Sequence, residues 1–314
     1  MTTAYIFPGQ GSQKMGMCKD IYEEYNHVKE LFNTVDEALR FKLSKIIFEG
    51  PEEKLTQTEN TQPALMLCSL AIAKTIEHLS NRQLSDTGQF AAGHSLGEFS
   101  ALTVTNGLSI TDSAKLLQLR GQAMQKAVPK GEGAMFALLG ANFEIAQKIC
   151  QSVKNHGVCE IANDNSVGQL VLSGNEIAIN AAIDLAKEKG FKAIKLKVSA
   201  PFHCSLMKPA QQKLKEALKN ISINKPTIRI ISNVTADKES LPDSIKDNLV
   251  KQVTATVRWT ESVRKMIEYG VDRFVEIGPG SVLSGLIKRI DSNVKTVSVQ
   301  SIEDIHKLVT EIDN

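Results

Sequence analysis

The chain has 314 residues, of which 42% are hydrophobic and 23% are charged, and this balance is typical of a folded globular protein. Its formal net charge of +2 gives no indication of a nucleic-acid-binding or membrane-binding surface. There is no apolar run of about 18 residues and no signal-peptide pattern at the N-terminus, so we expect neither a membrane span nor secretion. The five cysteines are dispersed without a CxxC pair, which argues against a disulfide framework or zinc site and fits a reducing compartment.

Hydrophobic patterning predicts strands and helices in the first 130 residues. The apolar run 4–7 ends at Pro8 and Gly9, and it indicates a buried strand that leads into a glycine-rich loop. A second short strand is expected at 89–92. Helices are predicted at 18–40, 62–80, 96–106 and 110–127.

Residues 131–198 predict a small inserted subdomain. Strands are expected at 133–139, 158–163, 168–173 and 192–198, and helices at 142–153 and 175–189. Their order, βαββαβ, is that of a ferredoxin-like unit, in which two helices cover one face of the sheet. We therefore predict a core formed by residues 1–130 and 199–314, and a ferredoxin-like subdomain formed by residues 131–198.

After the insert, the pattern again alternates between helices and strands. Helices are predicted at 205–220, 243–252, 260–269 and 281–290, and strands at 228–231, 272–277 and 294–299. Strands that alternate with helices form mainly parallel sheets, because each helix carries the chain back across the sheet. The predicted fold class is therefore α/β, with a mainly parallel sheet in the core.

The strongest local signal is the segment GHSLG at 93–97, which matches G-x-S-x-G between a predicted strand and a predicted helix. Glycines on both sides allow a tight turn that presents the Ser95 hydroxyl above the sheet edge, next to the N–H groups of the following helix. An ordinary strand-to-helix turn is the alternative interpretation. The strand–turn–helix context favours Ser95 as a catalytic nucleophile.

A serine nucleophile needs a base, and His203 is the candidate that remains after elimination. Four other histidines lie in segments without a motif, and His94 leaves the strand next to Ser95, so its side chain is expected to point away from the serine. His203 lies where the chain returns from the insert, and Pro201 stiffens that segment. Elimination alone makes a modest case.

Two further groups complete the predicted site. An oxyanion needs about two N–H donors, and those of Leu96, after the nucleophile, and Gln10, in the glycine-rich loop, are the candidates. Arg120 lies in the otherwise apolar helix segment LLQLRGQAM, and a buried arginine there would need a carboxylate or phosphate partner. A solvated surface arginine fits the spacing equally well. Gly121, next to it, would let a ligand or another backbone approach.

Taken together, these segments resemble the malonyl-CoA:acyl-carrier-protein transacylase family of type II fatty acid synthesis, in order over roughly residues 4–290. The matching segments are FPGQGSQ at 7–13, TQPAL at 61–65, GHSLGEFSAL at 93–102, LRGQAMQ at 119–125, NDNSVGQ at 163–169, VSAPFHCSLM at 198–207, NVTA at 233–236, VRW at 257–259 and EIGPGSVLSGLIKRI at 276–290. Cys204, where serine is frequent, and TVTNG at 103–107 are small departures that leave the expected chemistry unchanged.

The resemblance implies an α/β-hydrolase-like core with a ferredoxin-like insert. It implies Ser95 as the acylated nucleophile, His203 as general base and Arg120 as partner of the malonyl carboxylate. The oxyanion hole would be formed by the N–H groups of Gln10 and Leu96. Three further roles are carried over by the same resemblance: Gln252 orients the histidine, Phe202 marks malonyl selectivity, and Asn163 and Asn165 belong to a subdomain loop that faces the cleft.

The expected function follows from that family: malonyl transfer from malonyl-CoA, through a serine ester, to the phosphopantetheine thiol of acyl carrier protein in fatty acid biosynthesis. The expected partners are coenzyme A thioester and, transiently, acyl carrier protein, with no nucleic acid and no membrane. The resemblance implies no metal and no cofactor, a monomer, and a location in the cytoplasm or in an organelle that houses type II synthesis.

Three alternatives remain open at the level of sequence. GHSLG also occurs in lipases, but 111 residues follow His203, no HGGG-type motif is present, and Arg120 would have no role on a neutral ester. A transacylase for acetyl groups would leave the charge of Arg120 unpaired. A non-catalytic carrier-binding protein would have no use for Ser95, His203 and Arg120 together.

Overall fold

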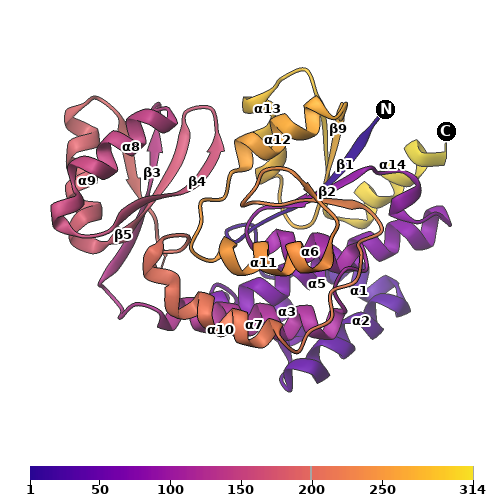
Figure 1. Ribbon diagram of the computed structural model, residues 1–314. Coiled ribbons are helices and arrows are strands. Elements are labelled where there is room, and N and C mark those ends of the chain that lie inside the picture. Colours follow the sequence, from indigo (N-terminus) through magenta and orange to yellow (C-terminus); the bar gives the residue numbers. More distant parts are fainter. Residues whose placement is uncertain (199, 314) are drawn as a thin grey trace.

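The structure is a computed structural model that describes residues 1–198 and 200–313. Figure 1 shows a larger part, which carries both chain ends, and a smaller part made of β3–β5, α8 and α9. The predicted boundary at residue 199 lies outside the described residues. Helices and strands are mixed in the larger part, whereas the smaller part has two helices on one antiparallel sheet.

A six-stranded sheet organises the larger part. Its order is β10-β9-β1-β2-β7-β8, and every pairing is parallel except that of β7 with β8. The strands are β1 (Thr3–Phe7), β2 (Phe90–Gly93), β7 (Arg229–Ile231), β8 (Lys238–Glu239), β9 (Arg273–Ile277) and β10 (Lys295–Val299). All residues of β1, β2 and β9 are buried, as expected of parallel strands covered on both faces. The prediction of a mainly parallel sheet is confirmed.

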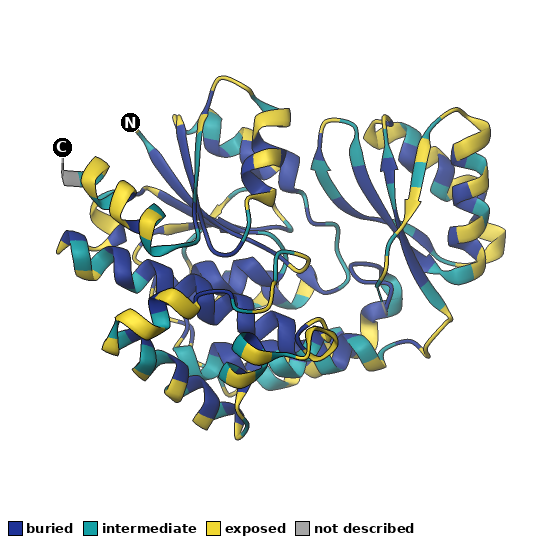
Figure 2. Cartoon of the chain, turned by 180° about the vertical axis from the view of Figure 1, so that it is seen from behind, coloured by how far each residue is buried: buried dark blue, intermediate teal, exposed yellow. Residues whose placement is uncertain are grey.

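Helices cover both faces of this sheet. On one face, α12 and α13 pack on Ala4 and Ile6 of β1, and on the other, α5 and α6 pack on the side of Tyr5 and Phe7. The helices are α1 (Lys19–Glu24), α2 (Asn26–Leu39), α3 (Leu43–Glu49), α4 (Glu52–Leu55), α5 (Thr58–Ser80), α6 (Leu96–Val104), α7 (Ile110–Lys126), α10 (Lys208–Leu218), α11 (Pro242–Gln252), α12 (Trp259–Glu268), α13 (Val282–Ile290) and α14 (Ile302–Asp313). Figure 2 shows the sheet and α5 as mostly buried, with exposed residues on the outer helices.

The smaller part has the predicted order βαββαβ. Its strands are β3 (Gly133–Leu139), β4 (Cys159–Ser166), β5 (Gln169–Asn175) and β6 (Lys192–Lys195), in the antiparallel order β4-β5-β3-β6. Helices α8 (Phe143–Ser152) and α9 (Glu176–Glu188) form a separate hydrophobic cluster with one face of this sheet. Short 3₁₀ helices lie at Leu84–Asp86, Lys154–His156 and Ser205–Met207.

Backbone hydrogen bonds join the smaller part to the larger one. Val257 donates to the carbonyl oxygen of Ala162 over 2.8 Å, and Asp164 donates to the carbonyl oxygen of Val257 over 3.0 Å. The Thr260 hydroxyl, at the start of α12, also contacts the Asp164 carboxylate over 2.7 Å. Strand β4 is thus fixed against the segment that leads into α12.

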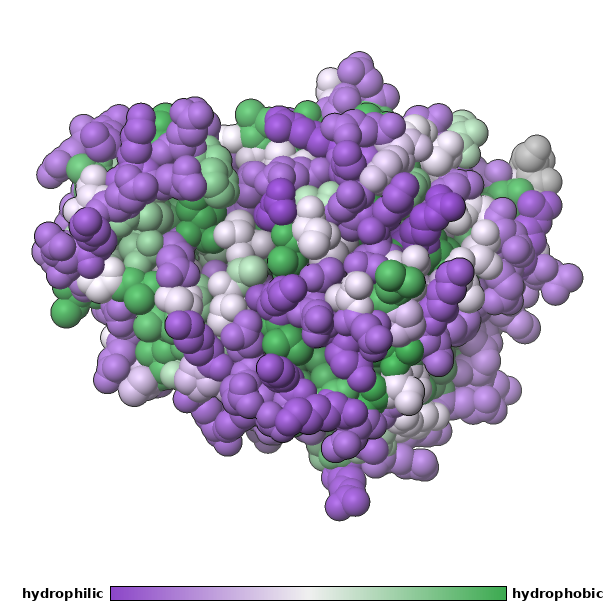
Figure 3. Space-filling view, in the orientation of Figure 1, coloured by the Kyte–Doolittle hydropathy of each residue, from purple (hydrophilic) through white to green (hydrophobic). Residues whose placement is uncertain are grey.

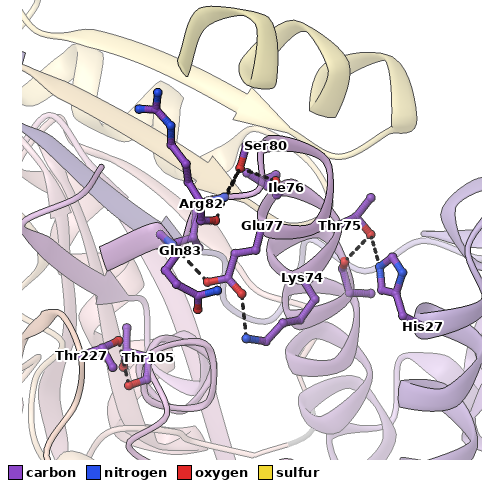
Figure 4. Close-up of polar contacts among 12 residues, drawn as sticks. His27, Lys74, Thr75, Ile76, Glu77, Ser80, Arg82, Gln83, Thr105 and Thr227 are labelled. Carbon is purple, nitrogen blue, oxygen red and sulfur yellow. Dashed lines mark hydrogen bonds and ion pairs between the residues drawn. The ribbon is translucent and has the colours of Figure 1, made fainter. Parts of the chain in front are cut away.

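Polar contacts at the C-terminal end of α5 fix the connection that leads to β2. The Glu77 carboxylate accepts from Lys74 Nζ over 2.8 Å and from the N–H of Leu84 over 3.1 Å (Figure 4). The ring of His27 from α2 meets the Thr75 hydroxyl at 3.2 Å in the same view. The Glu77 bonds hold the segment that leads to β2, the strand that precedes the predicted nucleophile, and the His27 contact joins α2 to α5.

Several predicted element bounds were wrong. The single helix expected at 18–40 is two helices, because Tyr25 takes an extended conformation (φ −112°, ψ 122°) that ends α1 and starts α2. Helix α5 starts at Thr58 instead of 62, so Pro63 lies inside it and removes one backbone hydrogen bond there. Strand β6 ends at Lys195 instead of 198. Helices α3, α4 and α14 were not predicted.

The described residues contain no helix long and apolar enough to cross a membrane. Hydrophilic residues dominate the face shown in Figure 3, and hydrophobic residues form small, separate patches on it.

Candidate active site

Ser95 lies at a sharp turn between the end of β2 and the start of α6. Its backbone has φ 55° and ψ −108°, outside the regions that serine prefers. A Cβ on Gly93 would lie 1.9 Å from the Gly97 carbonyl carbon, and one on Gly97 would lie 2.2 Å from the Phe7 carbonyl oxygen. Only glycine therefore fits on either side of the serine, because the turn, the helix and β1 approach too closely for any side chain.

His203 is placed to take the Ser95 proton. Its Nε2 lies 2.7 Å from Ser95 Oγ, and its Nδ1 lies 2.9 Å from the carbonyl oxygen of Gln252. Arg120 Nη2 also donates to Ser95 Oγ over 3.1 Å. Since a guanidinium only donates, the serine proton is directed to Nε2, and we assign the ring proton to Nδ1. The carbonyl oxygen of Gln252 thus takes the place that a carboxylate occupies in a serine–histidine–aspartate triad.

The imidazole of His203 is held neutral. Burial, together with the nearby Arg120 charge, lowers the pKa of His203 from 6.5 to about 3. The backbone after the histidine is fixed from the smaller part: the Glu160 carboxylate of β4 accepts from the Ser205 N–H over 2.8 Å and from its hydroxyl over 2.6 Å. A neutral histidine with an accepting Nε2 can serve as a general base near pH 7.

Arg120 is fully buried, which decides between the two alternatives that the sequence left open, but its partners in the protein are not carboxylates. Its guanidinium donates to Gln62 Oε1 over 2.7 Å and to Gln252 Oε1 over 2.9 Å, in addition to Ser95 Oγ. Burial lowers the pKa of Arg120 to about 10, and the negative charge of Glu98 opposes this shift. Within the described residues, its Nε has no hydrogen-bond partner. The site therefore presents a buried cation without a directly bound anion.

Gly121 explains how Arg120 reaches its amide partners. A Cβ at this position would lie 2.6 Å from the Cα of Glu59. The sequence allowed either a ligand or another backbone at this glycine, and the structure places the first turn of α5 there. The close approach of α7 and α5 brings Arg120 within hydrogen-bond distance of Gln62.

Two buried polar residues to which sequence analysis gave no role support this arrangement. Asn233 accepts from the Ser95 N–H over 2.8 Å and donates to the Gly93 carbonyl over 2.7 Å, so it fixes both ends of the turn. Glu98 accepts from Gln252 Nε2 over 2.8 Å and from the Asn233 N–H over 3.1 Å. Both residues stand in quoted motifs, GHSLGEFSAL and NVTA, and their places in those motifs are the signal that could have found them.

A cavity of about 140 Å³ opens above Ser95, between the two parts of the molecule. Its lining includes most of the predicted site residues together with several apolar side chains: Gln10, Gln62, His94, Ser95, Leu96, Arg120, Met124, Met135, Asn163, Leu196, Val198, Phe202 and His203. A larger cleft of about 1200 Å³ adjoins the cavity and shares Gln10 and Val198 with it. The reacting groups can thus be reached by a substrate longer than the cavity itself.

Asn163 and Asn165 lie on strand β4, not in a loop as expected, because β4 continues through two register shifts to Ser166. Asn163 lines the cavity, whereas Asn165 Oδ1 accepts a hydrogen bond from His94 Nε2 over 2.8 Å. His94 thus bonds to Asn165, and the histidine that bonds to the Ser95 hydroxyl is His203, the residue chosen by elimination. Neither asparagine contacts the reacting atoms of Ser95 or His203.

Within the ranges 1–198 and 200–313, no group of three or more His, Cys, Asp or Glu side chains could hold a metal ion. The arrangement that is present can perform acyl transfer: a hydroxyl nucleophile, a neutral base, and a buried cation beside them.

Comparison with known proteins agrees with this chemistry. Residues 4–308 match the family described as acyl transferase domain. A malonyl CoA-acyl carrier protein transacylase of Bacillus subtilis is 45% identical over 96% of this chain and 94% of its own length. The crystal structure of an acyl-carrier-protein S-malonyltransferase from Bartonella henselae has a TM-score of 0.97 at 44% identity, with all of both chains covered.

A further similar structure is a malonyl-transacylase in complex with its type II PKS acyl-carrier protein. It has a TM-score of 0.95 and 37% identity, and the match covers 99% of this chain and all of that one. Both the sequence identities and the full-length structural matches point to one family. The chain is an acyltransferase that belongs to the acyl transferase family, among the malonyl CoA-acyl carrier protein transacylases.

Proposed function

We propose that this enzyme moves a malonyl group from malonyl-CoA to the phosphopantetheine thiol of acyl carrier protein, for fatty acid biosynthesis, through an ester on Ser95. The observation that carries the proposal is the buried Arg120 guanidinium, which lies 3.1 Å from the nucleophile and has no carboxylate bound to it among the described residues. A malonyl group brings the missing carboxylate, and a planar guanidinium can bind it through two parallel hydrogen bonds.

In the first half-reaction, His203 removes the Ser95 proton as Oγ attacks the thioester carbon. The N–H groups of Gln10 and Leu96, both at the cavity, stabilise the oxyanion. The C–S bond then breaks, the coenzyme A sulfur leaves with the proton from His203, and malonyl-Ser95 remains. Arg120 meanwhile exchanges its bond to the serine for bonds to the malonyl carboxylate, beside Phe202.

In the second half-reaction, the carrier thiol enters by the same cleft and gives its proton to His203 as sulfur attacks the ester. The tetrahedral intermediate collapses, Ser95 recovers its proton, and malonyl thioester leaves on the carrier. Gln252 holds His203 through its backbone carbonyl in both halves. Nucleophile, base and countercharge all come from side chains, so the proposed steps need no metal and no redox cofactor.

We extend the proposal to the fold and the partners. The core of residues 1–130 and 199–314 is α/β-hydrolase-like, and residues 131–198 form a ferredoxin-like subdomain that lies over the nucleophile. The carrier binds transiently, as supported by the similar transacylase that was solved with its acyl-carrier protein. The enzyme acts as a monomer on coenzyme A thioesters, without nucleic acid or membrane, in the cytoplasm or in an organelle that houses this synthesis.

The decisive experiment compares malonyl and acetyl transfer by wild type and Arg120→Ala. Losing a charge-assisted pair in a desolvated site costs about 2–5 kcal/mol, which corresponds to a roughly thirtyfold to several-thousandfold loss of malonyl transfer. Acetyl transfer has no carboxylate to lose, so the malonyl-to-acetyl ratio of kcat/KM should flatten or invert. Arg120→Lys should restore the ratio only in part, because it keeps the charge without the fork.

Intact-mass measurement after brief incubation with malonyl-CoA, followed by peptide mapping, should place the malonyl group on Ser95. Ser95→Ala is the control and should carry no adduct. If Arg120→Ala lowers malonyl and acetyl transfer by the same factor, the carboxylate is not bound by Arg120. If thioester is hydrolysed faster than it is transferred to thiol, the enzyme is a hydrolase.

A further inference from the structure

Glu98 is a buried carboxyl group in the site that has no part in the chemistry proposed above. It lies in the first turn of α6, three residues after the nucleophile, and its exposed fraction is 2%. Its Oε2 accepts from Gln252 Nε2 over 2.8 Å and from the Asn233 N–H over 3.1 Å. Burying a carboxyl group is costly, so its presence beside the nucleophile calls for a function.

Gln252 connects this carboxylate to Arg120 and to both reacting residues. Its Nε2 donates to Glu98 and to the Ser95 carbonyl oxygen, its Oε1 accepts from Arg120 over 2.9 Å, and its backbone carbonyl accepts from His203. An amide can turn by 180° and exchange its oxygen and nitrogen. Turned in this way, Gln252 would set its oxygen against the carboxylate and its NH₂ group against the guanidinium, and both contacts would be repulsive.

We propose that Glu98 is a positioning residue for substrate selection: it fixes the orientation of the Gln252 amide, and thereby holds Arg120 where the malonyl carboxylate binds. This inference rests on the role proposed for Arg120. The acceptor that Glu98 supplies decides which end of the amide faces the guanidinium, so Glu98 acts on selectivity through Gln252 without touching the substrate.

The charges around Glu98 agree with this role. Burial raises the pKa of Glu98 to about 7, while the Asn233 N–H, the Gln252 amide, the charge of Arg120 from α7 and the Ser232 hydroxyl oppose this shift, so the group is a carboxylate above pH 7. The other titratable groups at the site, His203 and His94, both have lowered pKa values and are neutral. The carboxylate and the guanidinium therefore bind opposite ends of one amide without a direct ion pair.

The test uses two substitutions at the same position. Glu98→Met keeps the length of the side chain and removes the acceptor, and we expect the malonyl-to-acetyl ratio of kcat/KM to fall about tenfold to a hundredfold, the effect of losing a hydrogen bond to a charged group. Glu98→Gln can keep an oxygen toward Gln252 and turn its NH₂ group to the Ser232 hydroxyl. We expect it to restore the ratio to within about threefold of wild type.

Two further variants separate positioning from loss of structure. Glu276 of β9 is a fully buried carboxyl that binds the N–H groups at the start of α13, away from the cavity. Glu276→Met should lower the melting temperature and leave the ratio unchanged. Gln252→Met keeps the backbone carbonyl that His203 needs, and it should reproduce the Glu98→Met loss of ratio. The double variant should lose no more than either single one.

The outcomes distinguish this inference from the proposed function. Equal ratios in Glu98→Met and wild type, or a loss in Glu98→Gln as large as in Glu98→Met, would overturn positioning by an acceptor. If Glu98→Met does not fold, Gln252→Met decides, because an unchanged ratio there also overturns the inference. Arg120→Ala is measured in parallel: if it leaves the ratio unchanged, the proposed role of Arg120 fails, whatever the Glu98 variants do.

Discussion

The backbone is strained at both side chains that are proposed to react. Ser95 and His203 have φ angles of 55° and 57°, a region that disfavours side chains with a Cβ and costs on the order of 1–3 kcal/mol per residue. Hydrogen bonds from other elements hold each segment in place: Asn233 binds the Ser95 N–H, and Glu160 binds Ser205, two residues after His203. Strain at these two positions fits a pair of groups that must meet with fixed geometry.

The state of His203 leads to a prediction on pH. Because burial and Arg120 lower its pKa to about 3, the imidazole stays neutral well below pH 6.5. We expect kcat/KM for acylation by malonyl-CoA to change less than about threefold between pH 7 and pH 5.5, where an ordinary histidine base would lose about tenfold. Stopped-flow or quenched measurement of malonyl-enzyme formation would show this, and a tenfold loss for each pH unit below 6.5 would contradict it.

Removing the base tests the assignment itself. His203→Ala should slow acylation of Ser95 by about 10²–10⁴-fold, which is the usual effect of losing a general base. His94→Ala is the matched control, since His94 lines the same cavity but bonds to Asn165 and not to the serine. Equal losses in the two variants would show that His203 is not the base.

At the scale of elements, the turn between β2 and α6 depends on glycine. A Cβ on Gly97 would clash with the Phe7 carbonyl oxygen at 2.2 Å, whereas one on Gly285, in the first half of α13, meets nothing within 4 Å. We expect Gly97→Ala to push α6 away from β1, to lower stability and to reduce the malonyl-Ser95 yield at least tenfold. Gly285→Ala should be neutral or stabilise by up to about 1 kcal/mol.

Urea unfolding and intact-mass measurement on both variants provide the check. If Gly97→Ala keeps wild-type stability and adduct yield, the close approach of α6 and β1 is not required for the nucleophile.

The sequence predicted these elements unevenly, for reasons that particular residues show. The βαββαβ order was predictable because each element there has a clear period and a short turn. The break at Tyr25 was not, because no glycine or proline marks it and the residue simply adopts an extended conformation. A helix start at 62 would have placed Pro63 in the first turn, where proline is tolerated, yet α5 starts at Thr58 and contains Pro63 in its buried interior. For α14, the spacing of the buried Ile305 and Leu308 was a usable signal that was missed.

At the scale of the whole molecule, the site is assembled from distant segments. Ser95 and His203 are 108 positions apart, and Gln252 is 157 positions from the serine that it contacts. The motifs predicted that Ser95, Arg120 and His203 come together, because each of these residues lies in a separate motif of the same family. They could not predict that Arg120 lacks a carboxylate partner or that Glu98 binds Gln252, since those facts depend on how α5, α6, α7 and α11 pack together.

The buried Glu98 carboxyl links global stability to pH. Burial raises its pKa from 4.5 to about 7, against the lowering effects of its hydrogen bonds and of Arg120. Because of this raised pKa, between about pH 4.5 and pH 7 the folded state keeps a proton on Glu98 that the unfolded state has already released. The stabilising contribution of Glu98 is therefore fully present below pH 4.5 and is lost as the pH rises to about 7. His203, with its pKa lowered from 6.5 to about 3, acts in the opposite sense and weakens the fold as pH falls below 6.5.

The substitution Glu98→Gln removes the titration of the Glu98 carboxyl and keeps that of the His203 imidazole. The His203 effect is present in both proteins, so it largely cancels in the difference between their free energies of unfolding. We expect that difference to move in favour of Glu98→Gln as the pH rises from 4.5 to 7, and to level off above pH 7, because the variant never has to bury a charge. Urea unfolding of both proteins at half-unit steps of pH would measure it. A difference that is constant across this range, or that moves in favour of wild type, would show that the Glu98 carboxyl is already ionised in the fold at pH 4.5 to 7, at no cost relative to water.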